Sequence, residues 1–269
     1  LIIEEGCRIY LHADAPFIVD GSLVVNGTKN NEVQFRGDRL DNYYKDLPAS
    51  WPGIYFRGNS QDNIMTYTII KNADEAIVLD KPSLNANPKL VLHQCIIDNA
   101  YRAGILSYNS SVDADNSLIT NCGNNIVLQL GGDFHFINCT VAAYTNSYFI
   151  HTNPVLQVSN AADENGSTVT ADLNAIFTNC IFWGDFGDVQ DEVITDKQGS
   201  NIYNITLENC LYKAVNDPSN TTLSSVIKNI DPSFDSIDVN NKYYDFRITK
   251  NSLAPGIDNG INIAYPTDL

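Results

Sequence analysis

The chain has 269 residues, with 16 basic and 32 acidic side chains, and its formal net charge is −16. A charge of this sign argues against nucleic acid and anionic membrane surfaces as partners, because both repel an acidic surface. It leaves a cation, a basic partner or a neutral glycan, and the sequence has no apolar run long enough to span a membrane.

Residues 1–37 are predicted to form the first coils of a β-structure. Short β-branched runs alternate with glycine turns, as in residues 2–6 and 17–21, and this pattern is typical of strands joined by turns. Since the chain starts within the first of these runs, we expect a processed segment ahead of Leu1. Residues 38–50 are charged and aromatic and are predicted to form a surface loop, and loops of this length are often functional.

One short pattern then returns along residues 51–213, which we interpret as regular coils. Its copies align on a small residue that follows Asn or Gln, in steps of 22, 22 and 41 residues: Cys95, Ser117, Cys139 and Cys180. A further copy ends on Cys210. The positions three and five before this residue are mostly apolar, which predicts a strand with one buried face. Such a repeat predicts coils that bury their apolar face only against neighbouring coils.

The residue before the aligned position predicts a sharp corner. Asn116, Asn138, Asn179 and Asn209 stand there, and Asn tolerates a left-handed backbone better than most residues. We expect stacked Asn side chains to bond from coil to coil. The cysteines that follow face inward, and coils about 4.8 Å apart hold parallel side chains too far apart for a disulfide. Buried free thiols are therefore predicted.

A third strand completes each coil, at residues 76–79, 104–108, 125–130, 154–158 and 192–194. Three strands wound in one direction predict an all-β fold, a right-handed single-stranded parallel β-helix of about 22 residues per coil with loop insertions. Polar, turn-rich insertions near 159–172 and 184–201 are predicted to leave from one corner. Residues 214–269 are predicted to be irregular, and 1–269 to be a single domain.

Several stretches resemble a known family. They are residues 35–38 with 51–56 near the start, and 231–234, 244–248 and 252–260 near the end. They are similar to right-handed β-helix surface lipoproteins of Bacteroides-type bacteria, which have the pectate-lyase-like superfamily fold. The resemblance implies a location at the cell surface or outer membrane, on the extracellular side rather than in the periplasm. It also implies a lipid anchor outside this sequence and a chain that continues past Thr267–Leu269, but it specifies no chemistry.

The outward positions of the repeated strand place titratable side chains on one face. The alignment sets His93 beside Asp115 and Asp113 beside His135. Carboxylates and imidazoles at this spacing are able to bind a divalent metal or to act as acid and base, and β-helix enzymes that cleave polysaccharides carry acidic residues on such a face. Simple stabilisation by Asp–His pairs across strands is the alternative. No Lys or Arg occupies the neighbouring outward positions, which weakens the catalytic interpretation.

Two other groups of residues are candidates for binding. Aromatic rings at predicted strand ends and loops are suited to stacking on sugars or anchoring a partner: Tyr43, Tyr44, Trp51, Tyr55 and Trp183. Acidic residues in one insertion offer oxygen ligands for calcium, without the spacing of a dedicated calcium loop: Asp185, Asp188, Asp191 and Glu192. A solvated acidic loop explains the second group equally well, and no cofactor is otherwise predicted.

The sequence predicts a non-catalytic cell-surface β-helix module that acts as a binding or assembly component at the bacterial outer membrane. An outer-membrane protein complex or a surface glycan is the expected partner. The alternative is a polysaccharide lyase or glycoside hydrolase that acts on an extended glycan through His93, Asp113, Asp115 and His135. An enzyme requires an open groove above that face, whereas loops or a partner can cover the face of a scaffold.

Overall fold

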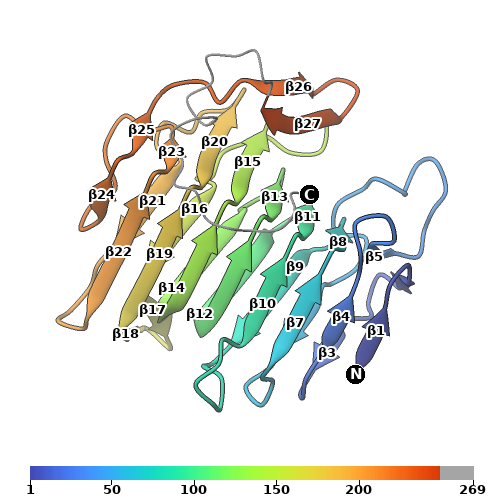
Figure 1. Cartoon of the computed structure of the whole chain (residues 1–269), viewed down its shortest axis with the longest axis horizontal. Coiled ribbons are helices and arrows are strands. Elements are labelled where there is room, and N and C mark those ends of the chain that lie inside the picture. The colour runs from blue at the N-terminus through green and yellow to red at the C-terminus, as the bar shows by residue number, and fades with distance from the viewer. Residues whose placement is uncertain (249–269) are drawn as a thin grey trace.

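The computed structural model describes residues 1–248, and in it three ribbons of parallel strands wind into one solenoid (Figure 1). Ribbon 1 contains β1 (Ile2–Glu4), β4 (Val24–Asn26), β7 (Asn63–Thr66), β10 (Leu90–His93), the second halves of β12 (Ala103–Asp115) and β14 (Ile126–Ile137), β19 (Leu173–Thr178), β22 (Tyr203–Glu208) and β24 (Thr222–Ser224).

Ribbon 2 contains β2 (Arg8–Leu11), β5 (Val33–Gly37), β8 (Thr68–Lys71), β11 (Ile96–Asp98), β13 (Leu118–Thr120), β15 (Thr140–Tyr144), β20 (Ile181–Asp185), β23 (Leu211–Tyr212) and β25 (Ile227–Lys228). Ribbon 3 contains β3 (Phe17–Val19), β6 (Ile54–Phe56), β9 (Glu75–Asp80), the first halves of β12 and β14, β16 (Leu156–Ser159) and β21 (Val193–Asp196). Strands β12 and β14 run unbroken round the corner from ribbon 3 to ribbon 1 and join these ribbons into one sheet.

The register between coils confirms the repeat alignment. Leu90 pairs with Val112, which pairs with Phe134, and the pairing continues to Ala175 and Ile205. All five side chains are buried, because alternate residues of a strand point to the same face. The predicted third strands are present as β9, β12, β14, β16 and β21.

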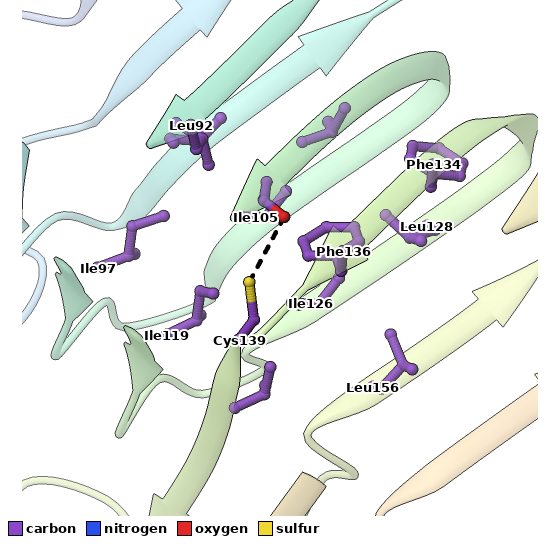
Figure 2. Close-up of a cluster of buried hydrophobic side chains, with 14 of the residues drawn as sticks. Leu92, Ile97, Ile105, Ile119, Ile126, Leu128, Phe134, Phe136, Cys139 and Leu156 are labelled. Carbon is purple, nitrogen blue, oxygen red and sulfur yellow. Dashed lines mark hydrogen bonds between the residues drawn. The ribbon is translucent and has the colours of Figure 1, made fainter. Parts of the chain in front are cut away.

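The core runs along the inside of the stack and is almost entirely aliphatic and aromatic. Figure 2 shows part of it, where Leu92, Ile105, Leu128 and Phe136 from neighbouring strands of the stack point into one interior. The ring of Phe136 stacks on that of Phe177, 5.4 Å away, in the next coil. Each coil therefore buries its apolar face against its neighbours, and the structure is an all-β parallel β-helix as predicted.

The corner between ribbons 1 and 2 has the predicted left-handed backbone. The φ angles of Asn116, Asn138, Asn179 and Asn209 are 44°, 54°, 55° and 51°. The side-chain amide of Asn179 donates to Asn138 Oδ1 at 2.9 Å, which is the expected bond between coils. A second ladder, which the sequence analysis missed, closes ribbon 2 at Asn72, Asn99 and Asn121, where φ is also positive.

The inward cysteines are free and buried, as predicted: Cys95, Cys139, Cys180 and Cys210. Cys139 points into the core (Figure 2), and its thiol donates to Ala114 O at 3.7 Å. Burial raises the pKa of the Cys95 thiol to about 12. These side chains fill small core positions and do not crosslink the coils.

The insertions follow the predicted corner only in part, because the segment between β20 and β21 connects ribbon 2 to ribbon 3, and their conformation also differs from the prediction. The insertion near 159–172 is not an irregular loop but a hairpin of β17 (Ala161–Glu164) and β18 (Ser167–Thr170). The insertion near 184–201 is two segments, because β21 lies in its middle and pairs with β16. The hairpin and the second of these segments both lie between ribbon 3 and ribbon 1, as expected for insertions from one corner.

The region after residue 213 is more regular than predicted. Strands β24 and β25 continue ribbons 1 and 2, and a hairpin of β26 (Phe234–Asp238) and β27 (Tyr243–Ile248) follows. Apolar residues of this hairpin, among them Phe234 and Phe246, pack on Tyr144 and Trp183 at the outer face of ribbon 2. The resembling stretch 252–260 and Thr267–Leu269 lie outside the described residues. Residues 1–248 contain no helix long and apolar enough to cross a membrane.

Candidate functional site

The two predicted His–Asp pairs are present on the outer face of ribbon 1. His93 and Asp115 are register partners, and so are Asp113 and His135. His93 Nδ1 lies 2.5 Å from Asp115 Oδ2, and His135 Nδ1 lies 3.0 Å from Asp113 Oδ1. The outward positions of the repeat therefore predict these contacts correctly.

The two His–Asp pairs differ in their surroundings. Asp113 and His135 line a groove of about 630 Å³, whereas His93 and Asp115 are not among its lining residues. One wall of the groove is the segment 82–88 between β9 and β10, and the other is Asp172 and Leu173 with Ile202 from the next coil. The predicted four-residue face is thus divided, and the groove lies over only one half of it.

The floor of the groove holds polar groups that the sequence analysis did not select. Asp133 lies 4.0 Å from His135 Nε2, so that this imidazole lies between two carboxylates. Asn174 donates to Asp133 Oδ1 at 2.7 Å. Asp133 and Asn174 stand six residues before Cys139 and Cys180, so extending the repeat alignment by one outward position finds both.

A buried hydroxyl at the groove has no partner. Ser110 is 2% exposed, lines the groove, and its Oγ makes no hydrogen bond. Gly132 lies opposite it with φ at 126°, and a Cβ there would come within 2.2 Å of Ser110 O. Ser110 stands two residues before the buried Val112, and alternate residues of a strand point to the same face, so this hydroxyl faces the interior and not a ligand in the groove.

Hydrogen bonds of Asp62 and Lys89 fix the position of the groove wall formed by residues 82–88. Asp62 accepts hydrogen bonds from the side chains of Asn85 and Asn87, which keep the pKa of its carboxyl below the usual value. Lys89 is fully buried, and its ammonium donates to the carbonyls of Arg57 and Asp80 at 3.1 and 2.8 Å. Burial lowers the pKa of Lys89. These contacts give the groove a fixed edge.

The charge of the groove is one-sided. Its ionisable lining residues within the described chain are Asp113, Asp133, Asp172 and His135, with no Lys or Arg. A lining of this kind repels anionic ligands and favours neutral or basic ones.

The predicted aromatic residues do not form one surface. Trp51 is fully buried and its ring N–H donates to Lys71 O, so this ring cannot stack on a ligand. Trp183 is 7% exposed beneath the C-terminal hairpin. Tyr55 donates to Glu75, and burial together with that carboxylate raises the pKa of Tyr55 to about 12. Tyr43 and Tyr44 contact each other on the 38–50 loop, well apart in the sequence from the groove residues.

The predicted acidic cluster does not converge. No group of three or more His, Cys, Asp or Glu side chains within residues 1–248 is arranged to hold a metal ion. Asp191 caps the backbone N–H groups of Val215 and Asn216, and Asp185 lies 3.4 Å from Lys213 Nζ. Glu192 points inward instead of outward and lies fully buried, 2.9 Å from His151 Nε2. Each of these three carboxylates contacts a different group of the protein, so they do not meet at one cation site.

The stacked coils and their register define a right-handed parallel β-helix. The family model of the right handed beta helix region matches residues 2–141, more than half of the chain, and the chain belongs to this family. Searches of curated proteins and of solved structures found no match.

Proposed function

We propose that this protein is a non-catalytic binding module at the bacterial cell surface, and that its groove receives an extended, uncharged glycan. The observation that carries the proposal is the open groove beside Asp113 and His135. A face that served only to stabilise the solenoid would need no such space. The resemblance to β-helix surface lipoproteins supports the location and leaves an outer-membrane protein complex as the other expected partner.

The shape and chemistry of the groove suit a saccharide chain. It crosses β12, β14 and β19 and reaches Ile202, just before β22, and three steps between parallel strands span roughly 14 Å. Amide, hydroxyl and carboxylate groups are able to bind vicinal hydroxyls, because they supply both donors and acceptors. The carboxylates disfavour polyuronates, so a neutral polysaccharide is the expected ligand class.

The proposal is tested by affinity electrophoresis and calorimetry with neutral β-glucan, xylan and polygalacturonate. Asp133→Asn keeps an oxygen that accepts from Asn174, while it removes the charge beside His135. We expect binding of a neutral glycan that weakens about tenfold, or about 1.4 kcal/mol, in this variant. Asp14→Asn, at an exposed position distant from the groove in sequence, is the matched control. Binding of none of the neutral glycans would overturn the proposal.

Glycoside hydrolysis is the second candidate function, favoured by the position of His135 between Asp113 and Asp133. Ser111 pairs with Asp133 and Asp113 with His135, so the two carboxylates belong to diagonal neighbours on one face of the sheet. Inverting glycosidases use two carboxyl groups about 6.5–9.5 Å apart. New reducing ends from the bound glycan, abolished by Asp113→Asn, would establish this activity, and their absence with intact binding would support the non-catalytic module.

A further inference from the structure

A second cleft lies at the corner where ribbon 2 ends. Its volume is about 420 Å³, and none of its lining residues belongs to the groove. Three segments distant in sequence surround it: the 38–50 loop at Asp46, the segment after β15 at Tyr148, and the turn between β26 and β27 at Lys242. We call it the amide cleft, because six asparagines line it: Asn72, Asn99, Asn121, Asn146, Asn240 and Asn241.

The asparagine ladder at the base of this cleft is incomplete. Asn99 donates to Asn72 Oδ1 at 2.8 Å and to Asp46 O at 2.9 Å, while Asn72 donates to Lys45 O at 2.8 Å. Asn121 is the next member of the ladder and is 2% exposed, but its Nδ2 has no partner among residues 1–248. The orientation of this amide is fixed, because its Oδ1 accepts from the backbone N–H of Tyr144 at 3.2 Å.

An unpaired buried amide donor destabilises the protein unless another group accepts from it. No group of residues 1–248 accepts from Asn121 Nδ2, so within this part of the chain the donor is left for a group that enters the cleft. The cleft lies directly against this amide. This places an unsatisfied donor at the bottom of a space large enough for a small polar ligand.

The charges that line the amide cleft are balanced, in contrast to the groove. Lys71 Nζ lies 3.2 Å from Asp98 Oδ2, so that this pair is neutral overall. Lys242 Nζ lies 3.6 Å from the centre of the Tyr148 ring, and Asp46 contributes the second carboxylate. A site with two cations, two anions and many amides selects neither sign of charge and provides both donors and acceptors.

We propose that the amide cleft is a second binding site, which takes a neutral saccharide of one or two units and satisfies Asn121 Nδ2 with a ligand oxygen. Tyr148 and Tyr244 supply aromatic surface at its rim, where amphipathic rings contact the carbon faces of sugars. This site is independent of the groove and does not rest on the function proposed for it.

The test is saturation-transfer NMR on the full chain with glucose, galactose, mannose and N-acetylglucosamine. Asn121→Asp keeps the oxygen that accepts from Tyr144 and the residue type that tolerates φ of 50°, but it removes the free donor. We expect at least tenfold weaker binding of the responding sugar. Asn138→Asp makes the same change at the other asparagine corner, also at positive φ, and should bind as the wild type does.

Two further variants keep the test decisive if Asn121→Asp does not fold. Tyr148→Ala and Lys242→Ala alter the rim of the cleft outside the coils, and each should weaken binding at least threefold. Asp133→Asn, in the groove, should leave this binding unchanged, which separates the two sites. No saturation transfer from any of the four sugars would mean that the cleft holds only water, and unaltered binding in Asn121→Asp would equally overturn the proposal.

Discussion

The molecule contains the same chemical pair in two settings. Asp113 and His135 lie on a coil face with side-chain exposures of 43% and 39%, whereas Glu192 and His151 lie in segments that connect ribbon 2 to ribbon 3, with exposures of 0% and 3%. The contact distances are similar, at 3.0 and 2.9 Å. Burial, and not geometry, therefore distinguishes them.

The difference shows how this solenoid separates stability from binding. Glu192 accepts from His151 and from the backbone N–H of Val155, so the buried pair connects the segments between ribbons 2 and 3 of two successive coils. The exposed pair makes no comparable contact with the backbone, and the groove in front of it stays open. Loss of the first should damage the fold, and loss of the second should damage only binding.

Removing Glu192 should give the largest effect. Glu192→Ala leaves His151 and Val155 N without their acceptor inside the protein, and breaking a buried pair costs about 3–5 kcal/mol of unfolding free energy. Asp113→Ala, the matched change on the coil face, should cost less than about 1 kcal/mol. Urea denaturation of both variants measures the contrast, and equal losses would contradict the role assigned to burial.

The second largest loss of stability is expected from a substitution that crowds the buried His151–Glu192 pair. A Cβ at Gly184 would lie 2.2 Å from His151 Nε2 and 2.3 Å from Glu192 Oε1, so Gly184→Ala should displace the pair and cost about 1–3 kcal/mol. No atom of residues 1–248 lies within 4 Å of a Cβ at Gly21, and Gly21→Ala should change stability by no more than about 0.5 kcal/mol. Thermal melts of the two variants provide the comparison, and a neutral Gly184→Ala would show that the pair is loosely held.

The His93–Asp115 pair should show a small pH dependence. The hydrogen bond that His93 donates to the Asp115 carboxylate raises the pKa of His93 above its ordinary value. A raised folded-state pKa stabilises the fold fully below the unfolded pKa of about 6.5, and this stabilisation is lost as the pH rises through the folded value. With His93 40% exposed, the gain should be below about 1 kcal/mol.

Urea denaturation at pH 5.5 and pH 8.5 measures this dependence. The stability difference between the wild type and His93→Gln should be larger at the lower pH. It should disappear when both proteins also carry Asp115→Asn, which removes the acceptor charge. A difference that grew with pH would have the wrong sign for this pair.

The sequence predicts the coil stack well because each coil repeats the same physical requirements. The step from Cys95 to Ser117 fixes the register, and the register alone places Asp113 beside His135. The asparagine at the corner reports its backbone conformation directly, since few other residue types tolerate it. A repeat of this kind can be recognised in a single sequence, because the copies can be aligned with one another.

The groove, the amide cleft and the buried pair could not be predicted in the same way, because insertions without a repeat build their walls. One signal was present: His151 and Glu192 are 41 residues apart, the same step that separates Cys139 from Cys180. The segments that connect ribbon 2 to ribbon 3 in successive coils therefore stack as the strands do. Trp51 misled the interpretation because an aromatic residue near a loop is as easily a core residue as a surface one.

The buried thiols allow the opening of individual coils to be followed over time. Each of the four inward cysteines reports on a different step of the stack, and the raised pKa of the Cys95 thiol leaves almost no thiolate to react while the coil is closed. Alkylation of a given cysteine therefore requires local opening of its own coil. Pulse labelling followed by peptide mapping would reveal from which end the solenoid unravels, without the introduction of any probe.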